Sequence, residues 1–272
     1  MPELPEVETT RRGVEPFARG RLVRALRLRE SRLRWPVDAT LPRRVSGARI
    51  TAVERRAKYL LFRLDTDTTL MLHLGMSGSL RVLPVDTPHR KHDHFDLELD
   101  SERILRFNDP RRFGSLHLIE GDPAQHPLLS SLGPEPLAAS FDADYLWQRT
   151  RKRRVAIKQF VMNAQVVVGV GNIYASEALF CAGVRPGRAA RLLKRGEVAA
   201  IVAAIKRVLA MAVEVGGTTL RDYVGADGNP GYFRQKLFVY ERAGEPCRSC
   251  ETPIRQRVQG QRSTYWCPTC QR

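Results

Sequence analysis

Four short stretches in the first half of the chain carry apolar residues at the spacing of β-strands. They are TTLMLHL (68–74), HFDLELD (94–100), RILRF (103–107) and SLHLIE (115–120). Each alternates or runs apolar, as half-buried or buried strands do. The turn sequence NDPRRFG separates the last two, and LGMSG (74–78) lies between strand-like runs. Short strands joined by loop tips favour antiparallel sheets over repeated βαβ units.

The pattern changes after residue 120. GDPAQHP and LGPEPLAAS concentrate proline and glycine over residues 121–140, which is typical of an interdomain linker. Further along, apolar residues recur every three or four positions, which predicts helices over 175–183 and 197–217. The longer helix carries one apolar stripe, made of Val198, Ile201, Val202, Ile205, Val208, Leu209 and Ala212. We interpret the stripes as core packing.

Composition limits the class of protein. The 272 residues suffice for one large domain or two ordinary ones. No apolar run approaches the ~20 residues that cross a bilayer, and the charged N-terminus lacks a signal-peptide core, so we expect a cytoplasmic protein. Lys and Arg number 45 against 29 acidic residues, a formal charge of +16. This excess indicates a nucleic-acid partner, ahead of a ribosomal surface or an acidic membrane; the alternative is a generally solvated basic surface.

Four of the five cysteines crowd the last 26 residues. They form two C-x-x-C pairs, Cys247 with Cys250 and Cys267 with Cys270. Two such pairs at this distance predict one tetrahedral Zn²⁺ held by four thiolates, with no open position for water. We therefore expect a structural zinc ion, with disulfides as the alternative. The strand-like PIRQRV and RSTYW predict a hairpin with QG as its turn, and Arg262 follows that turn.

Other candidate residues have both a structural and a chemical interpretation. In MPELPEVE, Pro5 and the glutamates suit a helix start, but trimming of Met1 would give Pro2 a free secondary amine. Lys58, in RRAKYLLF, is expected on a strand face with Leu60 and Phe62, where desolvation would lower its pKa unless it snorkels to solvent. Gly169 and Gly171 precede a helix and suit phosphate binding only weakly. The basic stretch 149–158 suits either a DNA backbone or solvent.

Several motifs, in order, resemble those of bacterial formamidopyrimidine-DNA glycosylases, repair enzymes for 8-oxoguanine, over nearly the whole chain. They are MPELPEVE, RRAKYLL, HLGMSGSL, KHDHFD, NDPRRFG, VVVGVGNIYASEALF, GGTTLRDYVGADGNPGYF and the two C-x-x-C pairs with QRSTYWC between them. The resemblance implies a bifunctional DNA glycosylase and AP lyase of base excision repair. It would act on oxidised purines in damaged double-stranded DNA through a proline Schiff base and β,δ-elimination.

The resemblance also implies an α+β fold with two domains. We expect an N-terminal β-sandwich catalytic domain at 1–133, a linker at 134–150 and a helix–two-turn–helix domain with a lesion-covering loop at 151–236. A zinc-ribbon finger would occupy 237–272, and DNA would lie in the cleft between the domains. The family expectation is a monomer, in the cytoplasm and associated with the nucleoid.

Residue roles follow from the matching motifs. The catalytic residues implied are Pro2 as nucleophile, Glu3 as its acid/base partner, Lys58 as proton donor in β-elimination and Arg262 in δ-elimination. The implied contacts to DNA phosphates or the opposing base are His92, Arg111, Arg153, Lys158 and Asn172. Met76, Arg111 and Phe113 would fill the gap left by the flipped nucleotide. Arg221, in the loop over the flipped base, stands where the family often has lysine, and the two are not interchangeable.

Two other functions remain open at this point. One is an endonuclease VIII type glycosylase for oxidised pyrimidines, which shares the Pro-Glu start. The other is a non-catalytic DNA- or RNA-binding protein that uses the zinc ribbon and the basic face. The combination of Pro2, Glu3 and Lys58 argues against the second.

Overall fold

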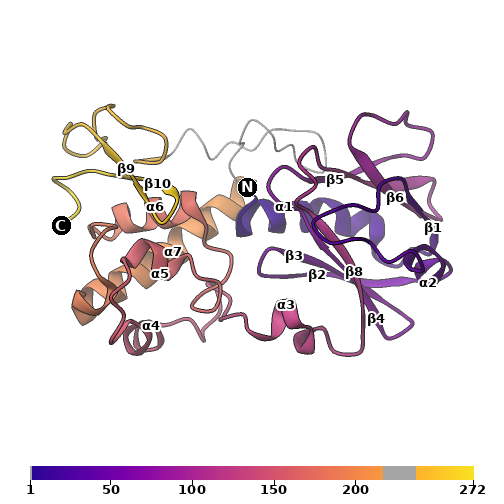
Figure 1. Ribbon diagram of the computed structural model, residues 1–272, viewed down its shortest axis with the longest axis horizontal. Coiled ribbons are helices and arrows are strands. Elements are labelled where there is room, and N and C mark those ends of the chain that lie inside the picture. Colours follow the sequence, from indigo (N-terminus) through magenta and orange to yellow (C-terminus); the bar gives the residue numbers. More distant parts are fainter. Residues whose placement is uncertain (1, 217–236) are drawn as a thin grey trace. The chain divides into compact units, whose positions relative to one another are not determined.

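The computed structural model describes residues 2–216 and 237–272, and its contacts divide the chain into two compact units. Unit 1 runs up to Ser130, and unit 2 runs from Ser131 to Glu214 and includes the C-terminal residues 237–272. Figure 1 labels the helices and strands of both units. None of the helices in the described ranges is long and apolar enough to cross a bilayer.

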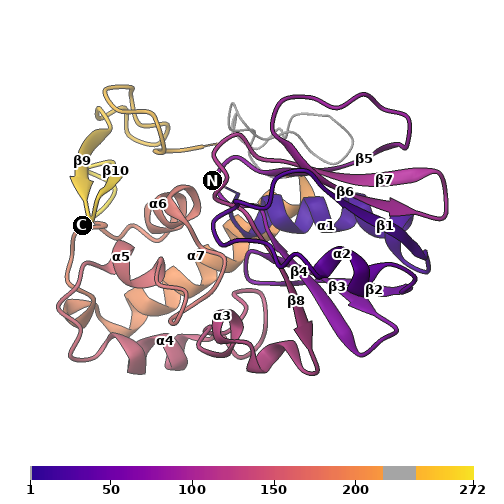
Figure 2. The same ribbon diagram turned by 45° about the vertical axis from the view of Figure 1, so that its right-hand side comes forward.

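Unit 1 consists of two four-stranded antiparallel sheets and short helices. Its elements are α1 (Leu4–Ala18), β1 (Val23–Leu28), α2 (Leu41–Val45), β2 (Ile50–Arg56), β3 (Tyr59–Leu64), β4 (Thr68–His73), β5 (Ser79–Pro84), β6 (Asp93–Leu99), β7 (Arg103–Asn108), β8 (Ser115–Glu120), η1 (Pro123–Gln125) and α3 (Pro127–Ser130). The strand orders are β1-β6-β7-β5 and β2-β3-β4-β8, and both sheets are visible in Figure 2. Helix α1 packs against β2 and β3 of one sheet and β5 of the other.

The strand predictions are confirmed. The stretches at 68–74, 94–100, 103–107 and 115–120 are β4, β6, β7 and β8, each within one residue of its predicted bounds. Their apolar residues enter one core together with α1, including Val14, Leu60, Phe62, Phe95 and Phe107. Burial of this apolar surface is the main force that holds the two sheets together.

Unit 2 is helical and ends in a hairpin. Its elements are α4 (Ala143–Thr150), α5 (Ile157–Val161), α6 (Asn172–Cys181), η2 (Ala190–Leu192), α7 (Arg195–Glu214), β9 (Arg255–Gln259) and β10 (Arg262–Trp266). Helix α6 packs against α5, α7 and β10, and α4 packs against α7. The segment 134–150, predicted as a linker, therefore contains a helix that belongs to this unit.

Both predicted helices are present, with shifted ends. Helix α7 buries the whole predicted stripe from Val198 to Ala212. Helix α6 begins at Asn172, three residues earlier than expected, because Gly171 is already its extended N-cap residue. Residues 173–180 of α6 are buried on every side, so this helix lacks the polar face that would have marked its start in the sequence.

Candidate active site and nucleic-acid interface

The first candidate residues lie at the N-terminal end of α1. Pro2 is buried, and Glu3, the N-cap residue, is 2% exposed. Glu3 and Glu6 form a capping box in which the backbone N–H of Glu3 donates to Glu6 Oε2 at 2.9 Å. Pro5 at the start of the helix leaves one fewer backbone N–H without a partner. The same short segment thus caps the helix and holds a carboxylate directly after Pro2.

Lys58 lies in a turn and not on a strand, which corrects the sequence prediction. β2 and β3 pair from Ile50↔Leu64 to Arg56↔Tyr59, which leaves Ala57 and Lys58 as a two-residue connection. Ala57 adopts a left-handed φ of 54°, as tight hairpin turns require. The apolar residues that follow suggested a longer strand, but the chain reverses before Tyr59. Lys58 is half-buried at this tip.

An arginine braces that turn. Arg55 donates to the carbonyl of Ala57 at 2.9 Å and to Glu8 Oε2, on α1, at 3.1 Å. Burial raises the pKa of Glu8, but hydrogen bonds from Arg11 and Arg12 and the nearby Arg55 outweigh it and lower the pKa overall. Glu8 is therefore a carboxylate at neutral pH. It links the helix that begins after Glu3 to the turn that carries Lys58.

His73 lies beside this turn. Its Nδ1 accepts the backbone N–H of Gly75 at 3.0 Å, and its ring lies 4.9 Å from that of Tyr59. Burial, followed by the charges of Lys58 and Arg34, lowers the pKa of His73 to about 4. The imidazole is thus neutral at physiological pH, with its proton on Nε2. It supports the backbone where the next loop begins.

Three loop tips of unit 1 carry the candidate DNA-contact residues. Met76 is half-buried in the loop between β4 and β5. Arg111 and Phe113 are exposed between β7 and β8, with the guanidinium 4.8 Å from the phenyl centroid. His92 is half-buried before β6, with a φ of 73°. The structure brings the loops of Met76, Arg111 and Phe113 into contact, because a Cβ on Gly75 would lie 2.4 Å from the nitrogen of Gly114.

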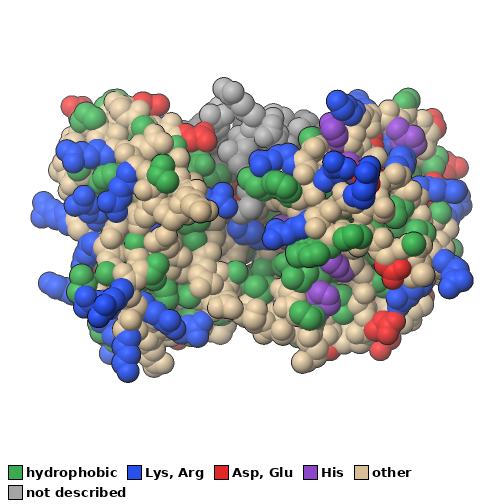
Figure 3. Space-filling view, viewed as in Figure 1, with side chains coloured by type: hydrophobic (Ala, Val, Ile, Leu, Met, Phe, Trp, Pro, Cys, Tyr) green, Lys and Arg blue, Asp and Glu red, His purple; other side chains and the backbone are tan. Residues whose placement is uncertain are grey.

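Basic residues outnumber acidic ones in this chain, 45 to 29. Figure 3 shows Lys and Arg spread over the face in view, with fewer acidic groups. Arg153 and Arg154 are exposed in the segment between α4 and α5. An exposed cation on such a segment can reach a phosphate without reorganising a core.

In unit 2 the candidate residues Lys158 and Asn172 converge on the hairpin that carries Arg262. Lys158, 1% exposed, donates from Nζ to the carbonyl of Ser263 and to Thr264 Oγ1, each at 2.9 Å. The side-chain amide of Asn172 donates to the same Ser263 carbonyl at 3.1 Å. Its Oδ1 is a buried oxygen that lacks a hydrogen-bond partner among the described residues. Both side chains thus fix the residue next to Arg262.

The hairpin turn lies one residue later than predicted. β9 and β10 pair from Arg255↔Trp266 to Gln259↔Arg262, so Gly260 and Gln261 form the turn. Both have a left-handed φ, of 57° and 59°, as in the mirror-image turns that suit strand twist. Arg262 is exposed at the first position of β10.

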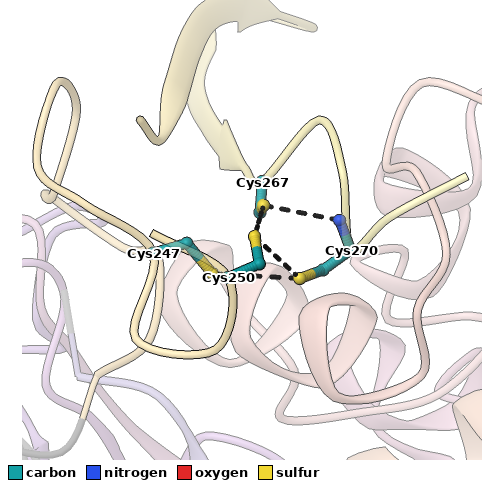
Figure 4. Close-up of side chains that lie close together, drawn as sticks. All are labelled: Cys247, Cys250, Cys267 and Cys270. Atoms are coloured by element: carbon teal, nitrogen blue, oxygen red, sulfur yellow. Dashed lines mark hydrogen bonds between the residues drawn. The ribbon is translucent and has the colours of Figure 1, made fainter. Parts of the chain in front are cut away.

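The four clustered cysteines converge at the base of this hairpin (Figure 4). All four Sγ atoms lie within 4.8 Å of one another, and Cys250 Sγ is 3.4 Å from both Cys267 Sγ and Cys270 Sγ. A tetrahedral zinc with Zn–S bonds of about 2.3 Å separates its sulfurs by roughly 3.8 Å, whereas a disulfide needs about 2.05 Å. Backbone N–H groups of Ser249 and Cys270 point at the sulfurs of Cys247 and Cys267. The donor set fits one structural zinc ion, as expected.

Two features connect the zinc module, residues 237–272, to the rest of unit 2. Buried residues of the module, including Val239 and Tyr265, pack against Phe180 of α6. Glu177, also on α6, accepts the backbone N–H groups of Phe238, Val239 and Tyr240 at 2.7 to 3.0 Å. Burial raises the pKa of Glu177 against the effect of these three donors.

Sequence reasoning missed several residues of the site. Arg55, His73, Asp109 and Glu177 hydrogen-bond to the segments that carry or adjoin candidate residues, through contacts that form only after folding. The one signal for them was their place inside the matched motifs, such as Glu177 in ASEALF. Arg221 lies outside the described residues.

Together these features define a two-unit zinc-finger protein with a buried N-terminal proline and loop tips suited to a nucleic acid. Three family models match the chain in succession. They are the formamidopyrimidine-DNA glycosylase N-terminal domain (residues 1–116), the H2TH domain of the same enzymes (132–224) and the zinc finger found in FPG and IleRS (244–272). The chain belongs to the formamidopyrimidine-DNA glycosylase family.

Individual relatives agree with this assignment. The formamidopyrimidine-DNA glycosylase of Thioalkalivibrio sulfidiphilus is 63% identical over 272 residues, all of both chains. The crystal structure of MutM (Fpg) from Thermus thermophilus is 41% identical with a TM-score of 0.90, covering 99% of this chain and 98% of its own. The complex of Lactococcus lactis Fpg with DNA containing an abasic site is 32% identical with a TM-score of 0.92, over 99% of each chain. The family, the α+β fold with its zinc finger, and the enzyme class expected from the sequence are confirmed.

Proposed function

We propose that this chain excises oxidised purines from duplex DNA and then cuts the strand, with the α-nitrogen of Pro2 as nucleophile. Family membership carries the glycosylase assignment. The single structural observation that carries the residue roles is the buried Pro2–Glu3 pair, fixed by the capping box of α1. A loose N-terminus would not present its amine in one place.

The choice of nucleophile follows from amine chemistry. An α-amino group with a pKa of ~7.7–8.0 is about a tenth or more unprotonated at pH 7, whereas a free lysine is roughly 300-fold less so. Once Met1 is removed, the nitrogen of Pro2 attacks C1′ of the damaged nucleotide, and the bond from C1′ to the base breaks. Because the amine is secondary, ring opening of the sugar leaves a permanently cationic iminium.

That iminium drives strand cleavage. It draws electrons from C2′, whose proton is lost, and the 3′ phosphate leaves with the C3′–O electron pair. A second elimination expels the 5′ phosphate, and hydrolysis of the iminium frees Pro2. Glu3, adjacent to the amine, is placed to exchange protons with the sugar oxygen or the nitrogen. We assign Lys58 as proton donor in the first elimination and Arg262 in the second.

The DNA must be held and its damaged nucleotide extruded, since C1′ is shielded in the duplex. We assign phosphate or opposing-base contacts to His92, Arg111, Arg153 and Asn172, and the contact to the flipped base to Arg221. Lys158, expected to contact DNA as well, is 1% exposed and bonded to the hairpin, so we assign it the orientation of Arg262 instead. Met76 and Phe113 supply apolar wedges for the vacated space. The guanidinium of Arg111 offers paired donors to the unpaired base.

The zinc ion, held by the four cysteines, supplies folding free energy to a module too small for its own core. In unit 2, Lys158 and Asn172 both donate to the carbonyl of Ser263 and so orient the strand that begins at Arg262. We propose that the helix–two-turn–helix domain includes α4 and so begins before residue 143, and that the other domain bounds are those expected above. We also propose that the protein acts as a monomer and works in the cytoplasm on nucleoid DNA.

The test is borohydride trapping on a duplex that contains 8-oxoguanine opposite cytosine. We expect zinc-loaded, Met1-trimmed protein to give a covalent complex and a nicked strand. The variant Pro2→Gly should nick far more slowly yet still bind DNA measurably. Unchanged nicking by that variant would show that a residue other than Pro2 is the nucleophile. A panel of duplexes with oxidised pyrimidines measures lesion preference, and faster cleavage there would contradict the purine assignment.

A further inference from the structure

Asp109, in the turn motif NDPRRFG, is a completely buried carboxylate whose role the proposed function leaves unassigned. Its Oδ1 accepts the hydroxyl of Ser77 at 2.7 Å and the backbone N–H of Arg111 at 3.2 Å. Its Oδ2 accepts the backbone N–H of Gly114 at 2.8 Å. One side chain therefore spans the β7–β8 loop from inside and reaches across to the β4–β5 loop.

The main chain of Asp109 makes further connections. Its N–H donates to the carbonyl of His92 at 3.1 Å. Its carbonyl lies 2.6 Å from Nε2 of His94, which must be the donor. The backbone bond to His92 explains how that residue is held at a φ of 73°. All three loop tips that carry Met76, Arg111, Phe113 and His92 thus meet at this one residue.

The loops it joins are in close backbone contact. A Cβ on Gly75 would lie 2.5 Å from the carbonyl carbon of Phe113, and one on Gly114 would lie 2.9 Å from the carbonyl oxygen of His73. Contact this close leaves no room for an intervening side chain. Because the loops touch, one tether between them is enough to fix the spacing of the residues at their tips.

The carboxylate suits this task better than its amide counterpart. Among residues 2–216 and 237–272, Asp109 forms no ion pair, and three uncharged donors satisfy its two oxygens: the hydroxyl of Ser77 and the backbone N–H groups of Arg111 and Gly114. A carboxylate presents two acceptor oxygens, whereas an asparagine presents one and turns an NH₂ group toward the remaining donor. A buried donor without a partner is costly.

We propose that Asp109 is a positioning residue that locks the Met76 loop and the Arg111–Phe113 loop into one preformed wedge for base extrusion. This inference rests on the proposed function, since it assumes that these three side chains enter the duplex. A wedge ordered in advance loses less conformational entropy on binding, so more of the binding free energy is available to unstack the base. Ser77, which donates to Asp109 from the β4–β5 loop, is the second positioning residue of this wedge.

The experiment compares Asp109→Asn and Ser77→Ala with wild type and with Ser46→Ala. The control also loses one hydroxyl, which donates to the carbonyl of Pro42 at an exposed site. Three single-turnover readouts are taken: excision of 8-oxoguanine, cleavage of a duplex with a preformed abasic site, and the fluorescence rise of 2-aminopurine placed beside the lesion. An abasic nucleotide has no base to unstack, so its cleavage depends little on the wedge.

We expect Asp109→Asn to slow excision and to weaken the fluorescence rise by about tenfold or more, and Ser77→Ala by several-fold, as the loss of charge-assisted hydrogen bonds implies. Abasic-site cleavage should stay within about twofold of wild type in both. Adding Ser77→Ala to Asp109→Asn should cost little more, because the two share one bond. Ser46→Ala should match wild type.

Equal losses on both substrates would overturn the proposal, since they would indicate a general structural defect. Wild-type excision and fluorescence in Ser77→Ala would overturn it as well, even if Asp109→Asn fails to fold. Failure of wild type itself to cleave or trap abasic-site DNA would instead refute the proposed function.

Discussion

At the residue scale, the N-terminal segment combines a structural and a chemical role. Glu3 and Glu6, 2% and 1% exposed, cap α1, and the same arrangement fixes Pro2 at the end of the chain. A helix start tolerates buried carboxylates because its free N–H groups and its dipole favour negative charge. The structural interpretation of MPELPEVE is therefore correct, and it is compatible with the chemical one.

The two roles of Glu3 can be separated with Glu3→Gln. Glutamine keeps an oxygen that accepts the helix N–H but can neither release nor take up a proton. We expect base excision to fall at least about 100-fold, in line with loss of a general acid/base. The melting temperature should change by only a few degrees, as measured by calorimetry. A stable variant with full activity would remove Glu3 from the chemistry.

His73 should make stability depend on pH. Its folded pKa of about 4 lies below the unfolded value near 6.5. Between these values the unfolded chain binds more protons, so this contribution is complete above about pH 6.5 and is lost as pH falls toward 4. Urea unfolding across this range should show a steeper fall for wild type than for His73→Gln. Parallel curves would contradict the assigned neutral state.

At the element scale, two hairpin tips carry the candidate cations. Lys58 lies in the β2–β3 turn, and Arg262 follows the β9–β10 turn. Hydrogen bonds fix the backbone of both hairpins next to these cations. Arg55 donates to the carbonyl of Ala57 beside Lys58, and Lys158 and Asn172 donate to the carbonyl of Ser263 beside Arg262. Short hairpins with a braced tip hold a long side chain in a defined place, which an open loop would not.

Removal of zinc should unfold the second hairpin. Zinc binding contributes roughly 10–16 kcal/mol to modules of this kind. We expect a chelator, or Cys250→Ser, to expose the buried Trp266 of β10, seen as a red shift in its fluorescence, and to abolish the second elimination, which we assign to Arg262. The control is Cys181→Ala, since Cys181 lies outside the cluster. Release of the 5′ phosphate without zinc would contradict the role given to Arg262.

The sequence predicted the strands and helices well, but it missed the start of α6 and the turn before β3. Apolar stretches, alternating or continuous, located β4, β6, β7 and β8 because each of these strands buries at least half of its residues. The start of α6 was missed because that helix is buried all round, and the position of Lys58 because the turn residue Ala57 carries no turn signal. Its left-handed φ of 54° depends on the pairing of β2 with β3.

At the scale of the whole molecule, the formal charge of +16 agrees with a polyanionic partner. The zinc site was predictable because its four ligands lie close in sequence with characteristic spacing. The bracing contacts were not. The bond between Ser77 and Asp109 joins residues 32 positions apart, and that between Glu177 and Val239 joins residues 62 apart, so only the folded chain reveals them.

The charge leads to a prediction about salt. Each phosphate contact contributes about −0.9 to the slope of log K against log salt for duplex DNA. We expect steep salt dependence for wild type and a slope shallower by about one unit in Arg153→Gln, measured by fluorescence anisotropy. Arg43→Gln, another exposed arginine, should leave the slope unchanged. Equal slopes for wild type and Arg153→Gln would exclude that phosphate contact.

The most direct test of the account is to locate the covalent bond. Wild-type protein is trapped with borohydride on 8-oxoguanine duplex DNA, digested with trypsin and nuclease, and analysed by tandem mass spectrometry. The account predicts a sugar-derived mass on the α-nitrogen of Pro2, in the N-terminal peptide that ends at Arg11. A modification on a lysine such as Lys58, or full cleavage by a chain that retains Met1, would contradict it.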